Sequence, residues 1–187
     1  MSFFSGTTRI IHASPIPTNI KKEKALALLH NHEFLLLADP HHASHEPLPL
    51  PIHPLEPSKH YKITKSENNN DKIKIYKVID NMPNPVWTSN VVSTEEFVDT
   101  EEGVWVRIRS PLGVVMETLW SIRVREKKEE QQEEGEGELE LVEDVTISAS
   151  RLVLGIVKGQ VEGNWKGIHQ KFIDRLVGDA EAGHAGK

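Results

Sequence analysis

Cysteine is absent from this 187-residue chain, which excludes disulfide bonds and thiolate metal sites and permits a reducing compartment. Long apolar runs are absent as well. The longest, Phe34–Ala38, falls far short of the roughly 20 residues that span a bilayer, and residues 1–17 lack the pattern of a signal peptide. We therefore expect a cytoplasmic protein without stable membrane insertion.

A basic surface is also lacking. The formal net charge is −6 at pH 7, whereas a general nucleic-acid binder shows a basic stripe that contacts phosphates. No glycine-rich loop stands between a predicted strand and a helix, as a phosphate-binding motif requires. We therefore expect no nucleic-acid partner and no cofactor. The length suits one domain, which we place at residues 1–178, followed by a disordered tail at residues 179–187.

What the chain does contain is a change of hydrophobic period. A strand is predicted at residues 7–12, ended by Pro15, and two short helices follow, one from about Ile20 and one at residues 32–38. From residue 60 onward, apolar residues alternate with polar ones, which is typical of half-buried strands. These strands are predicted at residues 60–65, 72–79, 87–94, 104–109, 114–124 and 139–147.

Two segments break this pattern. Residues 41–57 hold five prolines, which exclude a helix and a central strand, so we expect an extended crossing. Residues 126–138 consist of Glu, Lys, Gln and Gly and are predicted to form a mobile hairpin tip. The first segment also carries four histidines without a tight ligand spacing, and we expect no bound metal; they are His41, His42, His45 and His53.

The last predicted element is a long helix at residues 151–177, ended by Gly178. Only this helix is long enough to cover the apolar face of the sheet. The fold class is therefore α+β, with a curved antiparallel sheet of about six or seven strands wrapped on the helix. Its apolar stripe has steps of three and four residues and comprises Leu154, Val157, Val161, Trp165, Ile168, Phe172 and Leu176.

Glycines recur at every fourth position of this helix, mostly opposite the apolar stripe. Each costs about 1 kcal/mol of helix stability relative to alanine, so a compensating role is expected. The row leaves open a close contact with a second protomer, and hence a homodimer. It also leaves open a softer helix that opens for ligand entry. The four are Gly155, Gly159, Gly163 and Gly167.

Three segments carry a resemblance to known proteins: Phe3–Phe4 with Thr7–Ile10, Leu28–Phe34 and Asn164–His169. They are similar to an uncharacterised family of small fungal proteins. The order of elements resembles the helix-grip superfamily, which includes START lipid-transfer domains, plant pathogenesis-related allergens and bacterial polyketide aromatase/cyclase proteins. This resemblance implies a cavity for an apolar metabolite and, in several relatives, cyclisation or isomerisation without a redox cofactor. It implies no catalytic residue.

Glu143 is the leading candidate for chemistry. In the strand 139–147 the odd positions are apolar except for Glu143 in their middle. A carboxyl group on an apolar face is desolvated, which raises its pKa and suits general acid or base catalysis. The alternatives are a structural ion pair and a bulge that turns the side chain outward.

The neighbouring strand offers a second row on the same face, with Thr118 as a polar partner for Glu143.

Trp105, Arg107 and Arg109 share one face of their own strand. If that face is outward, it is a solvated surface with cation–π contacts; if it is inward, the arginines would bind an anionic group. Outward is favoured, because the alternate positions are apolar. Candidate ligand-binding residues are Met116, Trp120, Trp87, Leu141, Lys158, Val161, Trp165 and His169.

Lys158 and His169 flank the helix stripe and either reach a ligand at the cavity mouth or extend to solvent; solvent is favoured.

The sequence leads to two hypotheses for the function. The first is a cofactor-independent cyclase or isomerase that acts on a polyketide- or terpenoid-like intermediate of secondary metabolism, with Glu143 as acid or base. The second is a lipid or apolar-metabolite binding and transfer protein without chemistry. Both predict a small hydrophobic partner.

Overall fold

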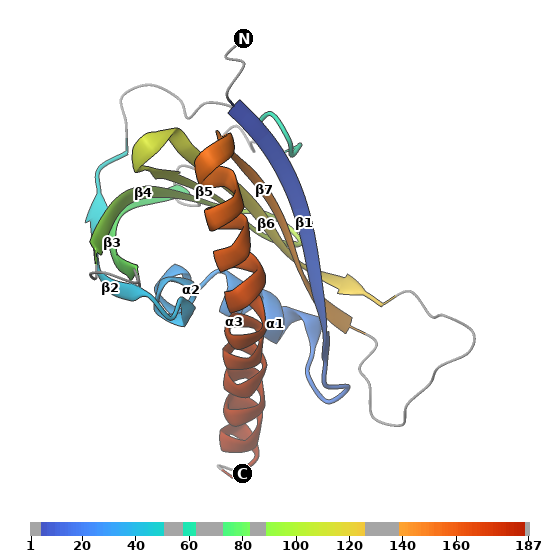
Figure 1. Cartoon of the computed structure of the whole chain (residues 1–187). Coiled ribbons are helices and arrows are strands. Elements are labelled where there is room, and N and C mark those ends of the chain that lie inside the picture. The colour runs from blue at the N-terminus through green and yellow to red at the C-terminus, as the bar shows by residue number, and fades with distance from the viewer. Residues whose placement is uncertain (1–4, 51–57, 63–72, 83–88, 126–138, 186–187) are drawn as a thin grey trace.

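The computed structural model describes residues 5–50, 58–62, 73–82, 89–125 and 139–185. Seven strands of this part of the chain form one antiparallel sheet in the order β1-β7-β6-β5-β4-β3-β2. The sheet curves around the long helix α3, and two short helices close its lower end (Figure 1). The strands are β1 (Ser5–Ile16), β2 (His42–Leu48), β3 (Ile73–Met82), β4 (Ser89–Asp99), β5 (Gly103–Ser110), β6 (Val114–Val124) and β7 (Leu139–Ser150). The helices are α1 (Lys22–Leu29), α2 (His32–Ala38), the single turn η2 (Pro111–Gly113) and α3 (Arg151–Ala185).

This is the predicted α+β helix-grip architecture, but both edge strands hold a proline where no strand was expected. Pro15 lies inside β1 instead of ending it, and Pro47 lies inside β2, where we expected irregular chain. β1 and β2 stand at the two ends of the strand order, so each has one neighbouring strand. A proline lacks an N–H, which an edge strand tolerates because one side of its backbone needs no partner.

The end of α3 also differs from the prediction. The helix passes through Gly178 and continues to Ala185, so residues 179–185 are helical where we expected a disordered tail. Ala180 is 6% exposed and belongs to the core, and Arg175 pairs with Asp179 one turn later. A buried contact and an i,i+4 ion pair favour continuation of the helix past the glycine.

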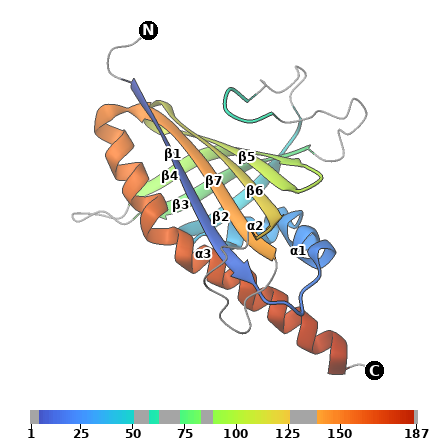
Figure 2. The ribbon, with the colours of Figure 1, turned by 90° about the vertical axis from the view of Figure 1, so that its right-hand side faces the viewer.

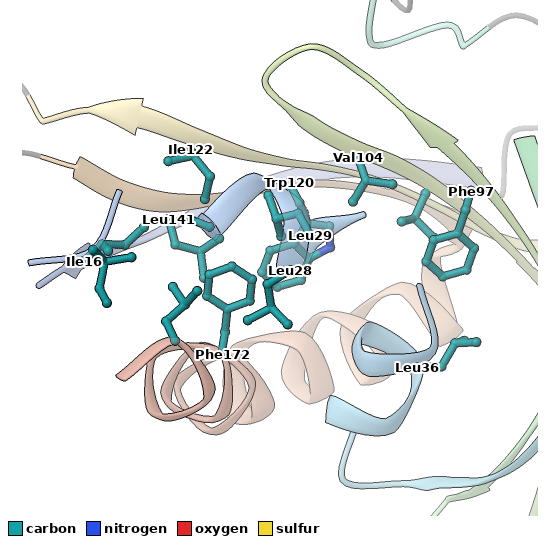
Figure 3. Packing of buried hydrophobic residues seen from close by; sticks show 14 of the residues in the cluster. Ile16, Leu28, Leu29, Leu36, Phe97, Val104, Trp120, Ile122, Leu141 and Phe172 are labelled. Carbon is teal, nitrogen blue, oxygen red and sulfur yellow. The ribbon is translucent and has the colours of Figure 1, made fainter. Parts of the chain in front are cut away.

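The apolar core lies between the inner face of the sheet, which is the face toward α3, and the helices. Alternate residues of β5 and β6 contribute to it, together with Leu141 of β7. Phe172 and Leu176 of α3 and Leu28 and Leu29 of α1 pack against them (Figure 3). This core therefore lies between the sheet, the two short helices and the second half of α3.

The two halves of α3 differ in burial. No residue from 151 to 168 is buried, and burial begins at His169 and continues with Phe172 and Leu176. The apolar stripe of the first half is only half-buried, although Leu154 contacts β1 at Gly6. A Cβ added at any of the four glycines of the row would meet nothing within 4 Å. The first half of α3 is thus less buried against the strands than the second half, and no described segment lies against its glycine row.

The outer face of the sheet, opposite α3, is covered in part by residues 58–62 (Figure 2). Tyr61 reaches it with its hydroxyl, which donates a hydrogen bond to the Asp144 carbonyl at 2.8 Å. Arg107 does point away from the core, as predicted. That face is not solvated there, however, because Arg107 and Trp105 are each 2% exposed.

Candidate functional site

Glu143 lies on the inner face of β7, is 6% exposed and has a partner from the far end of the chain. Strand β1 pairs with β7 so that His12 lies directly opposite Glu143. The His12 Nδ1–H donates to Glu143 Oε2 at 2.9 Å. Both side chains are less than a tenth exposed, so the bond is formed where water does not compete with it.

A second histidine approaches the same carboxylate from α3. His169 Nε2 lies 3.7 Å from Glu143 Oε2, while His169 Nδ1 lies 2.8 Å from the hydroxyl oxygen of Ser14. His169 is 1% exposed, and its Nε2 has no hydrogen-bond partner within the described part of the chain. The expectation that His169 extends to solvent is therefore wrong.

Two tryptophans enclose these polar groups. Trp165 of α3 stacks on the His12 ring with centroids 4.5 Å apart and planes 6° from parallel. Its ring lies edge-on to His169 at 5.2 Å, and Trp120 of β6 lies 5.4 Å from His169. The Glu143 cluster, as we name it, consists of His12, Ser14, Trp120, Glu143, Trp165 and His169.

The geometry of the cluster fixes the chemistry it can perform. A carboxylate only accepts hydrogen bonds, so Nδ1 of His12 carries the hydrogen and Nε2 of the neutral ring keeps a lone pair. Glu143 also stabilises the imidazolium that forms when Nε2 takes up a proton. A histidine oriented by a carboxylate in this way is able to act as a general base, and the indole of Trp165 stacks on its ring.

The remaining predicted site residues lie at varied distances from the cluster. Leu141 is buried in the core below it. Thr118 is 4% exposed on the inner face of β6, opposite Val145, one inward position along β7 from Glu143. Met116 and Val161 are half-buried. Lys158 is 44% exposed and pairs with Glu162 at 3.5 Å, so it is turned to solvent. Trp87 lies outside the described residues.

Sequence reasoning missed His12 and Ser14. Both stand on the face of β1 that also carries the core residue Ile16, so alternation alone could have directed them inward. Their relevance depends on the β1–β7 register, however, which joins residues 131 positions apart for His12 and Glu143. No local signal in the chain specifies that register.

A second set of polar side chains lies on the inner face, nearer the β2 edge of the sheet. Glu95 of β4 is 7% exposed, and burial, followed by the charges of Asp80 and Asp39, raises its pKa to about 8. Burial likewise raises the pKa of Asp80 to about 6. Ser93 Oγ and His42 Nδ1 are buried there without a hydrogen-bond partner among the described residues.

The raised pKa of Glu95 predicts a pH dependence of stability. Folded Glu95 holds a proton up to about pH 8, whereas an unfolded glutamate loses it near pH 4.5, so the folded state binds more protons between these values. We therefore expect the free energy of unfolding to fall by roughly 2 kcal/mol from pH 6 to pH 8. Urea unfolding at the two pH values measures this loss, which Glu95→Gln should abolish and Glu140→Gln should leave in place. An equal loss in wild type and Glu95→Gln would contradict the assignment.

Four other histidines, at positions 30, 32, 42 and 45, form contacts within the fold. His30 Nε2 lies within hydrogen-bond distance of the carbonyls of Thr100 and Gly103, and His32 bonds Asp99 at 2.7 Å. His42 and His45 bond each other at 3.0 Å on β2. Across the described ranges, no three potential metal-ligating side chains converge. His53 lies outside them.

Comparison with known proteins gives a family and a fold. Residues 5–178 match a family described as a domain of unknown function, DUF7053. No curated protein matches the chain. The chain is similar in structure to TTHA0849 from Thermus thermophilus, with 15% identity over 93% of this chain and 99% of that one and a TM-score of 0.52.

Two further structures share the fold and are larger. One is the di-domain ARO/CYC BexL from the BE-7585A biosynthetic pathway, with 9% identity over 90% of this chain and a TM-score of 0.56. The other is the di-domain ARO/CYC StfQ from the steffimycin biosynthetic pathway, with 12% identity over 92% and a TM-score of 0.56. The chain covers 49% and 52% of these proteins, respectively.

None of the helices that the structure describes has the length and apolar character to cross a bilayer.

Proposed function

Since the chain belongs to the DUF7053 family, whose function is unknown, we propose a function from its own residues. The protein binds a small apolar molecule between the sheet and the first half of α3. It performs acid–base chemistry on that molecule at the Glu143 cluster. The reaction class is a cofactor-independent cyclisation or isomerisation of a polyketide- or terpenoid-like intermediate. The single observation that carries this proposal is the buried His12–Glu143 pair, with His169 Nε2 3.7 Å from the same carboxylate.

The surroundings of the cluster support binding of an apolar ligand. The stripe on the first half of α3 is half-buried, as expected of a surface that a ligand completes. Met116 and Ile108 on the inner face are half-buried in the same way. Two structures of this fold are named as ARO/CYC proteins of biosynthetic pathways, in keeping with this reaction class. A single ligand-binding domain at residues 1–178 is part of the proposal.

The chemistry would require both histidines of the cluster, His12 and His169. His12 Nε2 would remove a proton from a carbon next to a carbonyl, and the ring would become an imidazolium held by Glu143. His169 would return a proton to a different atom, which moves a double bond or completes a ring closure with no net gain or loss of electrons. Thr118 would donate a hydrogen bond to the ligand above Glu143.

Binding is tested with Nile red, an uncharged apolar dye whose fluorescence rises on leaving water. We expect wild type to bind the dye and Val161→Asp to bind it about tenfold more weakly, because the substitution places a charge on the apolar stripe. Ile156→Asp is the matched control, since Ile156 is 64% exposed on the same helix. Equal affinities in the two variants would contradict ligand binding at this place.

A carrier without chemistry is the alternative that the same experiment leaves standing. It uses the apolar stripe but not the His12–Glu143 pair. Dye binding together with an inert Glu143 cluster would therefore favour the lipid or metabolite carrier.

A further inference from the structure

A pocket of about 150 Å³ lies on the outer face of the sheet, away from the Glu143 cluster. Its floor comes from strands β5, β6 and β7, and its wall comes from the segment 58–62. We name it the outer pocket. Its lining residues are Lys59, His60, Arg107, Arg109, Val115, Glu117, Thr146 and Ser148.

The side chains on the floor of the outer pocket are buried and are held by hydrogen bonds. Arg107, Glu117 and Thr146 are 2%, 5% and 3% exposed. The wall is attached at two points. Ser58 donates its hydroxyl hydrogen to Glu117 Oε2, and the Tyr61 hydroxyl lies 3.0 Å from Thr146 Oγ1. Burial raises the pKa of Tyr61 to about 12, so this anchor stays protonated at neutral pH.

The carboxylate in the pocket is already neutralised. Glu117 Oε1 accepts a hydrogen bond from Arg107 Nε at 3.1 Å and forms an ion pair with an Arg107 terminal nitrogen at 3.0 Å. Its other oxygen accepts from Ser58. Arg107 is balanced further by Glu96 at 3.3 Å. A cationic ligand would therefore find no unshared negative charge on the floor.

The rim of the outer pocket carries further basic groups. Arg109 is 39% exposed, with its Nε 3.5 Å from Glu96, and a guanidinium has five N–H donors in a fork that fits an oxyanion. Lys59 and His60 face it from the wall. In a protein of net charge −6, this is a local concentration of positive charge in a partly enclosed space, which strengthens its attraction for an anion.

We propose that the outer pocket binds a small oxyanion, either inorganic phosphate or the phosphate or carboxylate group of a small metabolite. Arg109 and Lys59 supply the charge, and the hydroxyl group of Ser148 lies at the base. A cavity of about this volume is known to hold a molecule of benzene size, which limits the ligand to a few non-hydrogen atoms inside the pocket. The site is independent of the apolar ligand proposed for the inner face.

Isothermal titration of the full-length protein with sodium phosphate, and separately with sodium acetate, tests this site at constant ionic strength. We expect saturable binding of at least one of the two anions. Arg109→Gln and Lys59→Gln should each weaken it about tenfold, the loss expected for one charge-assisted hydrogen bond. Arg175→Gln is the control, since Arg175 is 58% exposed on α3 and far from the pocket, and it should bind as wild type does.

Comparing the two anions shows whether the pocket prefers a phosphate or a carboxylate group. Binding of phosphate alone assigns a phosphate site, and binding of acetate alone assigns a carboxylate site. The proposal is overturned if neither anion binds, or if the Arg109→Gln and Lys59→Gln variants bind as tightly as the Arg175→Gln control. Nile red binding is measured on the same samples, so failure of this site is distinguished from failure of the inner-face site.

Discussion

Glu143→Gln is expected to slow the ring opening of 5-nitrobenzisoxazole by about 100-fold, the lower end of the range for a positioned general base. This probe is flat and mostly apolar, as the ligand proposed for the inner face is. A base removes its C3 proton, the N–O bond breaks, and the coloured cyanophenolate that forms is followed by absorbance. Glutamine keeps the shape of Glu143 but cannot stabilise an imidazolium at His12, 2.9 Å away.

The control for this experiment is Glu140→Gln on the same strand. Glu140 lies on the outer face of β7 and pairs in register with Pro15 and Arg123, so its loss leaves the cluster intact. We expect its rate to equal that of wild type. Equal rates in wild type and folded Glu143→Gln would show that the cluster is only a structural ion pair, and the carrier function would replace the enzymatic one.

Arg107→Met is expected to lower the free energy of unfolding by about 3–5 kcal/mol, as removal of one partner from a buried ion pair does. The guanidinium lies between Glu96 and Glu117 and 4.6 Å from the centre of the Trp105 ring. Methionine preserves much of the apolar stem but removes the cation that Glu96 and Glu117 share, and each carboxylate is less than a tenth exposed. Urea unfolding followed by tryptophan fluorescence measures the loss.

Arg109→Met is the matched control for Arg107. It lies two residues along the same strand and contacts Glu96, but it is 39% exposed, so we expect a loss of no more than about 1 kcal/mol. Adding Glu96→Gln and Glu117→Gln to Arg107→Met should recover part of the stability, because the unpaired charges are then removed. Similar losses for Arg107→Met and Arg109→Met would refute a buried charge network.

The alternation of strands β6 and β7 was sufficient to place Glu143, Thr118 and Trp120 on the inner face, because a period of two leaves little choice of face. The same reasoning directed Arg107 outward. It could not show that Arg107 is buried, since the cover comes from Tyr61 and its neighbours, which join the sheet only through long-range contacts.

The helix shows a different limit of sequence reasoning. Lys158 and His169 flank the apolar stripe, yet one is 44% exposed and the other 1%. The hydrophobic pattern specifies an angle around the helix axis but not the distance of each turn from the sheet. That distance is set by the whole β1–β7 surface, so the burial of His169, and with it the Glu143 cluster, could not be predicted from residues 151–177 alone.

The unequal burial of α3 divides one continuous helix into regions of different local stability. Its second half is held by Phe172, Leu176 and Ala180, whereas its first half has no buried residue and carries four glycines with open space around them. Local unfolding requires little free energy where few apolar contacts are lost. Amide hydrogens of the first half should therefore exchange with solvent much faster than those after His169. Fraying of this half would admit a ligand to the inner face while the anchored half keeps the domain folded.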